Sequence, residues 1–250
     1  MQQTHTMQQT PAEFAAEYAK YNYSFLEDPE SELIARLLVA HAQGPQILDL
    51  GCGPVHQSVR LFLPKNARSV GADFSTHNIE HTKALLASGE ITEGNLRAVN
   101  FLYSKIRQQE LDVDPADIIR EQRKQIEDLR VHDIRQFEPA FDGKFNTVMQ
   151  IGCFLSLDTL AELQKALDNV ARYLVPGGVF INANWLQDEY KERPFGFNGK
   201  LSELLKFESY CEALQASGLT LMQAGKSLDV HPFTKKHGYT QLVWAVLRKT

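Results

Sequence analysis

The chain has 250 residues, of which 43% are hydrophobic and 23% are charged, a balance that is typical of a globular protein. A chain of this length buries enough apolar surface to fold without disulfides or a structural metal, so no metal site is expected. The net charge of −5 argues against a nucleic-acid partner, because phosphate contacts require clustered Lys and Arg. The densest basic stretch, residues 120–124, is interleaved with acidic side chains and indicates a solvated helix face.

The cysteines and the N-terminal residues indicate the cellular compartment. Cys52, Cys153 and Cys211 are far apart and form no CxxC motif, which is typical of a reducing compartment. The first ten residues, MQQTHTMQQT, lack the apolar core of a signal peptide, and no apolar run approaches the length of a membrane span. We therefore expect a cytoplasmic protein without a membrane partner. The sequence does not indicate an oligomeric state.

The hydrophobic pattern alternates between strands and helices along most of the chain. Residues 1–10 are rich in Gln and Thr, which predicts a disordered tail, and a helical pattern follows from Pro11 to about His41. The further elements are predicted as strands at 46–50, 69–73, 129–133, 146–151, 179–184, 219–224 and 240–247, and as helices through 59–61 and at 77–88, 157–174 and 203–216.

Residues 91–128 interrupt this alternation. They form two polar helical patterns, broken near residues 112–115, and we interpret them as a helical insertion before the third strand. The alternation of strands and helices elsewhere predicts an α/β fold with a doubly wound, mostly parallel seven-stranded sheet. Because no repeat or flexible linker is evident, residues 11–250 are predicted to form a single domain.

The strongest functional motif is the stretch 47–54, with the sequence ILDLGCGP. A buried strand delivers Asp49, and a tight turn follows in which Gly51 and Gly53 allow close approach of a ligand to the backbone around Cys52. A carboxylate two residues before the first glycine repels a phosphate but attracts an ammonium group. The motif therefore favours a nucleotide with an amino-acid end, and the alternative is a purely structural turn.

Two further acids follow later strands. Asp73 ends the second strand twenty residues after Gly53, at the distance where an acid typically binds ribose hydroxyls. Alternatively, Asp73 could cap the next helix, as could Ser75. Asp133 ends the third predicted strand, where its carboxylate can accept a hydrogen bond from an adenine amino group while Ile134 packs on the ring. The alternative is a turn residue, because Asp is common in turns at strand ends.

These landmarks, in this order, resemble the class I S-adenosylmethionine-dependent methyltransferases. Their first motif is similar to residues 49–53, and later ones are similar to Asp73, Asp133 and the stretch 174–178, LVPGG. The resemblance spans about residues 12–248. It implies a Rossmann-like methyltransferase domain that binds S-adenosyl-L-methionine and releases S-adenosyl-L-homocysteine.

A narrower resemblance is to the nicotinamide, phenylethanolamine and indolethylamine N-methyltransferases. It rests on the Gly53-Pro54-Val55 turn, the stretch 73–78 (DFSTHN) and the insertion before the third strand. It implies an N-terminal helical lid whose tyrosines close over the cofactor, although these aromatic residues could simply pack in the core. Together, the motifs and the resemblance imply cofactor contacts at Tyr18, Tyr23, Asp49, Gly51, Cys52, Gly53, Asp73, Phe74, Asn78, Asp133, Ile134, Gln150 and Ile151.

The acceptor is expected to be a small molecule, with an amine nitrogen favoured by the narrower resemblance and oxygen or sulfur as alternatives. That family often has a carboxylate at the end of strand five, whereas this chain has Asn184, which cannot pair with a cation. We expect Tyr18, Asn184 and Tyr190 to position the acceptor. Direct methyl displacement depends mainly on positioning, so no general base is assigned. His56 and His77 are expected at the surface or at helix starts.

Other functions are less consistent with the motifs. An NAD-dependent oxidoreductase would have a third glycine at position 56, where the chain has His56. An aminopropyl transferase would need acidic residues for a polyamine. A DNA amino-methyltransferase would carry an Asp/Asn-Pro-Pro-aromatic stretch where residues 150–154 read QIGCF. A non-catalytic nucleotide-binding subunit remains an alternative, because a fold does not by itself determine function.

Overall fold

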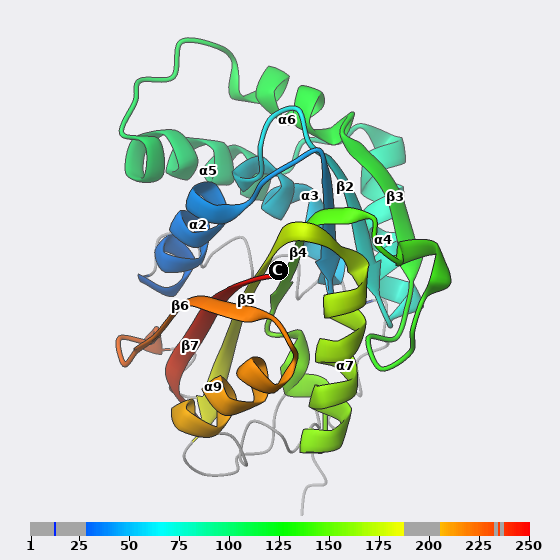
Figure 1. Cartoon of the computed structure of the whole chain (residues 1–250). Coiled ribbons are helices and arrows are strands. Elements are labelled where there is room, and N and C mark those ends of the chain that lie inside the picture. Colours follow the sequence, from blue (N-terminus) through cyan, green and yellow to red (C-terminus); the bar gives the residue numbers. More distant parts are fainter. Residues whose placement is uncertain (1–12, 14–28, 188–205, 233–234, 236–237) are drawn as a thin grey trace, which may run out of the picture.

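The seven strands form one sheet in the order β3-β2-β1-β4-β5-β7-β6 (Figure 1). The structure, a computed structural model, describes residues 13, 29–187, 206–232, 235 and 238–250. The neighbouring pairs among β1 to β5 are parallel, and β7 runs antiparallel to both β5 and β6. The strand bounds are β1 (Gln46–Leu50), β2 (Arg68–Asp73), β3 (Ile126–Val131), β4 (Phe145–Ile151), β5 (Leu174–Gln187), β6 (Thr220–Ser227) and β7 (Tyr239–Arg248). The predicted α/β fold with a mostly parallel seven-stranded sheet is confirmed.

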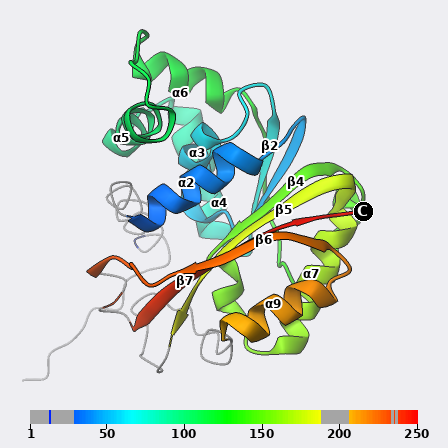
Figure 2. The same ribbon diagram turned by 60° about the vertical axis from the view of Figure 1, so that its left-hand side comes forward.

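Helices cover both faces of the sheet, as Figure 2 shows. The first face carries α2 (Pro29–His41), α3 (His56–Val59) between the 3-10 turns η1 (Gly53–Val55) and η2 (Arg60–Phe62), α4 (Thr76–Ser88), α5 (Glu93–Phe101), the π-helical turn η3 (Leu102–Arg107) and α6 (Pro115–Arg123). The second face carries α7 (Leu160–Tyr173) and α9 (Phe207–Ala216), with the short turns η4 (Pro139–Phe141) and η5 (Cys153–Ser156) in the connections around β4.

Alternate residues of β1 face opposite sides of the sheet, as the two-residue period of a strand requires. Leu48 and Leu50 pack with residues of α7 and α9, whereas Ile47 packs with residues of α2, α5 and α6. Asp49 shares the face of Ile47 and lies beside Gly71 of β2. This face also carries α3, which directly follows the Gly-rich turn.

Several element bounds differ from the predictions. Strand β3 covers Ile126–Val131, so the insertion ends earlier than residue 128 and Asp133 lies in the turn after the strand. Helix α7 ends at Tyr173, and β5 begins at Leu174, which already pairs with Phe145 of β4. The register with β4 then shifts, and pairing resumes at Val179 with Thr147, so the Pro-Gly-Gly stretch forms an irregularity within β5.

The insertion lies at the end of the sheet where the parallel strands begin (Figure 1). A buried polar network connects it to α3. Asn95 Nδ2 donates to Ser58 Oγ at 3.0 Å, and Arg123 Nη2 donates to Gln57 Oε1 at 2.8 Å and to Asn95 Oδ1 at 3.0 Å. The insertion is therefore packed on the first face, away from the carboxyl ends of the parallel strands.

Some predictions fall outside the described part of the chain. These are the tail over residues 1–10, the tyrosines of the expected lid, Tyr18 and Tyr23, and the positioning candidate Tyr190. In the part that the structure describes, none of the helices combines the length and the apolar character needed to span a bilayer.

Candidate cofactor site

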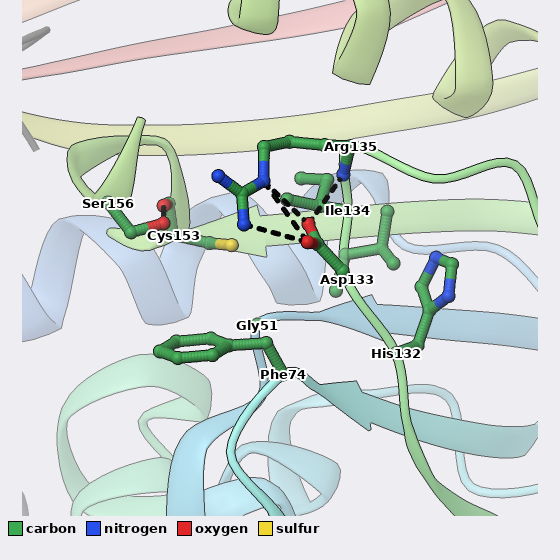
Figure 3. A pocket seen from close by; sticks show the side chains of 9 residues that line it. Gly51, Phe74, His132, Asp133, Ile134, Arg135, Cys153 and Ser156 are labelled. Atoms are coloured by element: carbon green, nitrogen blue, oxygen red, sulfur yellow. Dashed lines mark hydrogen bonds and ion pairs between the residues drawn. The ribbon is translucent and has the colours of Figure 1, made fainter. Parts of the chain in front are cut away.

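An open pocket lies at the carboxyl ends of β1 to β4 (Figure 3). Strand β1 pairs with β2 on one side and β4 on the other, so the chain order reverses at this point of the sheet. Ligands of open α/β sheets bind in the crevice at such a switch point. The lining residues are Leu50, Gly51, Phe74, His132, Asp133, Ile134, Arg135, Cys153 and Ser156.

Gly51 turns the chain at the end of β1 with a φ of 71°, a conformation that favours glycine. A Cβ atom at this position would lie 2.3 Å from Cys153 Cβ and 2.5 Å from Cys153 Sγ. The backbone N–H groups of Gly51 and Cys52 both donate to the carbonyl oxygen of Ala72, at 2.7 and 3.1 Å. The turn is thus hydrogen-bonded to β2 on one side and packed closely against Cys153 on the other.

Asp73 is buried at the end of β2 and accepts three hydrogen bonds. Its Oδ2 accepts from the Gly53 N–H at 2.9 Å, and its Oδ1 accepts from the Ser75 N–H at 2.8 Å and from Asn78 Nδ2 at 3.1 Å. Burial raises the pKa of the Asp73 carboxyl, and these hydrogen bonds oppose that rise. Asn78 Oδ1 is buried beside this carboxylate without a hydrogen-bond partner in the described residues.

Asp49 does not line the pocket. Its side chain is on the α3 side of the sheet, where Oδ2 lies 2.8 Å from His56 Nδ1, and His56 Nε2 lies 3.1 Å from Ser69 Oγ. His56 is the first residue of α3, as expected of a helix start, but the expectation of a surface position is wrong because it is 0% exposed. Its ring is enclosed between α3 and the strands β1 and β2.

Asp133 faces the pocket from the turn after β3 and forms an ion pair with Arg135 (Figure 3). Arg135 Nη2 lies 2.8 Å from Asp133 Oδ2, and its Nη1 lies 3.4 Å from Glu162 Oε1. The hydrogen bond from Arg135 holds the pKa of the Asp133 carboxyl below its usual value. Phe74 is 59% exposed at the mouth of the same pocket, so a large aromatic surface is available to a ligand.

Negative charge is concentrated around the Gly-rich turn. Burial raises the pKa values of the Cys52 and Cys153 thiols, and the carboxylates of Asp49 and Asp73 raise both further. Asp133 also raises the pKa of Cys153. Both thiols are therefore neutral near pH 7, while three carboxylates lie close together. Arg135 lines the same pocket and offsets the charge of Asp133, so it is the other two carboxylates, Asp49 and Asp73, that favour a ligand with positive charge.

Asn184 and Gln150 lie in a buried amide cluster and not in the pocket lining. Asn184 is 2% exposed, and its amide contacts that of Gln150 at 3.1 and 3.2 Å and donates to Asn182 Oδ1 at 2.9 Å. The Tyr210 hydroxyl of α9 donates to the same Asn182 oxygen. Ile151, at the end of β4, is half-buried and packs with residues of the first face.

Four of the predicted cofactor residues, Gly51, Phe74, Asp133 and Ile134, come together in the pocket lining. Cys52, Gly53, Asp73 and Asn78 surround the turn behind it. The sequence interpretation missed five lining residues: Leu50, His132, Arg135, Cys153 and Ser156. Leu50 ends β1, and the other four lie in the segments that follow β3 and β4. Because the carboxyl ends of parallel strands converge at one edge of the sheet, the residues after each predicted strand could have been identified as candidates.

A family model described as a methyltransferase domain matches residues 41–215. The chain belongs to this methyltransferase family. Family membership implies the use of S-adenosyl-L-methionine. The comparisons do not support the narrower resemblance to the nicotinamide and phenylethanolamine enzymes, because the matching model describes a methyltransferase domain in general. No curated protein matches the chain.

Solved structures of two methyltransferases and of a cyclase have the same fold. An S-adenosylmethionine-dependent methyltransferase from Aquifex aeolicus has 14% identity and a TM-score of 0.57, with 97% of this chain and 100% of that chain covered. The N-methyltransferase NodS from Bradyrhizobium japonicum WM9, in complex with S-adenosyl-L-homocysteine, has 13% identity and a TM-score of 0.56, with 94% and 98% covered. The [4+2]-cyclase SpnF has 15% identity and a TM-score of 0.56, with 89% and 80% covered.

The residues at the turn fit the methyl donor that the family uses. Gly51 lets the chain turn at the edge of the pocket while Cys153 occupies the place that a side chain at residue 51 would take. The unpartnered Asn78 Oδ1 beside Asp73 can accept a hydrogen bond from a hydroxyl group. The group of carboxylates suits a ligand that carries a sulfonium and an ammonium group.

Proposed function

We propose that this protein transfers a methyl group from S-adenosyl-L-methionine to a small-molecule acceptor. The observation that carries the proposal is the pair of buried carboxylates, Asp49 and Asp73, at the turn at Gly51, with a third acid, Asp133, paired with Arg135 across the pocket. A pyrophosphate-containing dinucleotide would be repelled by this charge, whereas a cationic nucleoside is attracted to it. NAD-dependent hydride transfer is disfavoured for the same reason.

Each end of the cofactor has a proposed set of contacts. Asp73 and Asn78 bind the ribose hydroxyls, and Asp133 accepts a hydrogen bond from the adenine amino group while Phe74 and Ile134 pack on the ring. Asp49 pairs with the ammonium group. The bound donor supplies a methyl group on a sulfonium centre. The chain's contribution is to align the acceptor with that methyl group and to exclude water from the site.

An amine nitrogen is our preferred acceptor. The proposal rests on the Gly53-Pro54 turn and the stretch 73–78, which resemble enzymes that methylate amines. One of the similar structures is itself an N-methyltransferase, although a likeness at 13% identity is evidence of the fold alone. Because Asn184 is buried in an amide cluster, we expect Tyr18 and Tyr190 to contribute more to acceptor positioning than Asn184 does.

We also propose a cytoplasmic location and an acceptor other than nucleic acid. All three cysteines are free thiols, which is consistent with a reducing compartment. The net charge of −5 opposes binding to a polyanion.

Isothermal titration with S-adenosyl-L-homocysteine and with NAD tests the cofactor assignment. We expect micromolar binding of the former, no binding of NAD, and at least about a tenfold loss of affinity in Asp73→Ala, because that change removes charge-assisted hydrogen bonds. Asp112→Ala, an exposed aspartate in the insertion, is the matched control and should bind as the wild type does. Clear NAD binding without S-adenosyl-L-homocysteine binding would contradict the proposal.

A second assay identifies the acceptor atom and separates methyl transfer from binding alone. The protein is incubated with methyl-labelled S-adenosyl-L-methionine and three matched panels of small amines, alcohols or phenols, and thiols. Label transfer to the amines alone supports our preferred acceptor, and transfer to another panel corrects it. Binding of the donor without label transfer to any panel would favour a non-catalytic role or another chemistry on the same fold, as the cyclase neighbour illustrates.

A further inference from the structure

Three polar side chains form a buried chain of contacts beneath the Gly-rich turn. His56 Nδ1 lies 2.8 Å from Asp49 Oδ2, and His56 Nε2 lies 3.1 Å from Ser69 Oγ. His56 and Ser69 are completely buried, and Asp49 is 3% exposed. His56 is therefore shielded from solvent and is not one of the residues that line the pocket, so any functional effect that it has must act through a neighbour.

The neighbouring strands are shaped to accommodate the imidazole ring. Asp49 pairs with Gly71 in the parallel register of β1 and β2, and Ser69 lies two residues before Gly71 on the same face. A Cβ atom at Gly71 would lie 3.0 Å from His56 Cγ and 2.8 Å from Leu129 Cδ2. The absence of a side chain at Gly71 thus leaves the space in which the ring reaches both polar partners.

The hydrogen-bond chemistry determines how this arrangement acts on Asp49. An ionised carboxylate only accepts hydrogen bonds, so His56 Nδ1 carries the proton and donates to Oδ2. Ser69 holds the opposite side of the ring through Nε2. Asp49 Oδ1 makes no hydrogen bond with the described residues, although the side chain as a whole is only 4% exposed. One carboxylate oxygen is therefore fixed by the protein, while the other has no hydrogen-bond partner among the described residues.

We propose that His56 is a positioning residue that orients the Asp49 carboxylate toward the ammonium group of the cofactor. This inference rests on the proposed function, because it assigns Asp49 to the amino-acid end of S-adenosyl-L-methionine. A carboxylate already held by a buried donor loses little conformational freedom when the ligand binds. Its attraction to the ammonium group therefore contributes to the affinity with little entropic cost. Removal of the donor leaves the carboxylate free to turn and lowers that contribution.

Two ligands distinguish positioning from general support of the fold. S-adenosyl-L-homocysteine has the ammonium group, whereas 5′-methylthioadenosine has the same nucleoside without the amino-acid end. For His56→Leu we expect an affinity loss of about tenfold or more for S-adenosyl-L-homocysteine and less than about twofold for 5′-methylthioadenosine, measured by isothermal titration. His41→Leu, at the last residue of α2, is the control for removal of a histidine and should leave both affinities unchanged.

Conservative variants test the same point if His56→Leu does not fold. In His56→Asn the side-chain amide can donate from the place of Nδ1, so affinity for S-adenosyl-L-homocysteine should remain within about threefold of the wild type. In His56→Gln the amide extends toward Ser69, and the selective loss should reappear. In an Asp49→Asn background, replacement of His56 by Asn or Gln should add no further loss, because the residue acts through Asp49.

The outcomes separate failure of this inference from failure of the proposed function. If the wild type binds neither ligand, the proposed function itself is wrong. If the wild type binds both and the His56 variants lose both ligands equally, or lose neither, then His56 does not position Asp49 and the inference is overturned. A loss confined to the ligand with the ammonium group supports it.

Discussion

At the scale of single residues, Gly51 is the position where a side chain is least compatible with the structure. Its φ of 71° is a conformation that residues with a side chain rarely adopt. In addition, a Cβ atom at residue 51 would lie only 2.3 Å from Cys153 Cβ. For Gly51→Ala we expect a loss of stability greater than the ~1–2 kcal/mol that a left-handed conformation costs, because the turn must also move away from Cys153. Since the turn lines the pocket, affinity for S-adenosyl-L-homocysteine should fall at least about tenfold.

Gly89→Ala is the matched control for this prediction. Gly89 caps α4 with a φ of 67°, and a Cβ atom there would meet nothing within 4 Å. The control should therefore show the conformational cost alone, of about 1 kcal/mol, with unchanged affinity. Denaturant unfolding and titration of both variants check the prediction. Equal losses of stability and affinity in the two variants would show that the contact with Cys153 has no effect.

The acidic residues show what single-residue motifs do and do not predict. The sequence placed Asp49, Asp73 and Asp133 at or just after strand ends, and the structure brings all three near the turn. Their partners were not predictable from the motifs. Asp73 is held by Gly53 and Asn78, which are near it in the motif. Asp49 is held by His56, for which the sequence predicted a surface position or a helix start but not a buried contact.

At the scale of elements, the insertion is anchored by one buried asparagine. Asn95 Oδ1 accepts from Thr92 and Arg123, while its Nδ2 donates to Ser58 of α3. Asn95→Ala removes these bonds and leaves Ser58 without that donor, so we expect a loss of about 1–3 kcal/mol in the free energy of unfolding. Because the insertion lies away from the carboxyl ends of the strands, affinity for S-adenosyl-L-homocysteine should change less than about twofold.

The exposed Asn100 on the same helix provides the control for this element. Asn100→Ala should change stability by no more than about 0.5 kcal/mol, as is usual for exposed positions. Urea unfolding gives the stability of both variants, and isothermal titration gives their affinity. A large affinity loss in Asn95→Ala with little loss of stability would mean that the insertion communicates with the cofactor site.

At the scale of the whole molecule, a ligand that binds only the folded chain stabilises it by mass action. The site is built from the ends of four strands and the turns that follow them, so occupation should oppose unfolding of the sheet as a unit. At a concentration of S-adenosyl-L-homocysteine about 100 times its Kd, the gain is about 2.7 kcal/mol. For a chain of this length, this corresponds to a rise in Tm of about 5–10 °C.

Thermal unfolding with and without the ligand checks this expectation. NAD at the same concentration should leave Tm unchanged, and Asp73→Ala should show a much smaller rise with S-adenosyl-L-homocysteine than the wild type does. A rise with NAD of equal size would contradict the selectivity expected from the carboxylate group.

The sequence by itself determined the fold class, the seven strands and the position of the Gly-rich turn, because hydrophobic periodicity and glycine placement are local properties of the chain. Strand pairing is harder to predict from local sequence, and β5 extends beyond its predicted bounds, to Leu174 and Gln187. Only the tertiary structure decided that His56 is buried against Asp49, that Arg135 pairs with Asp133 and that Asn184 is enclosed in an amide cluster. Such contacts depend on strand register and on which face of the sheet each helix covers, and local sequence patterns do not specify these.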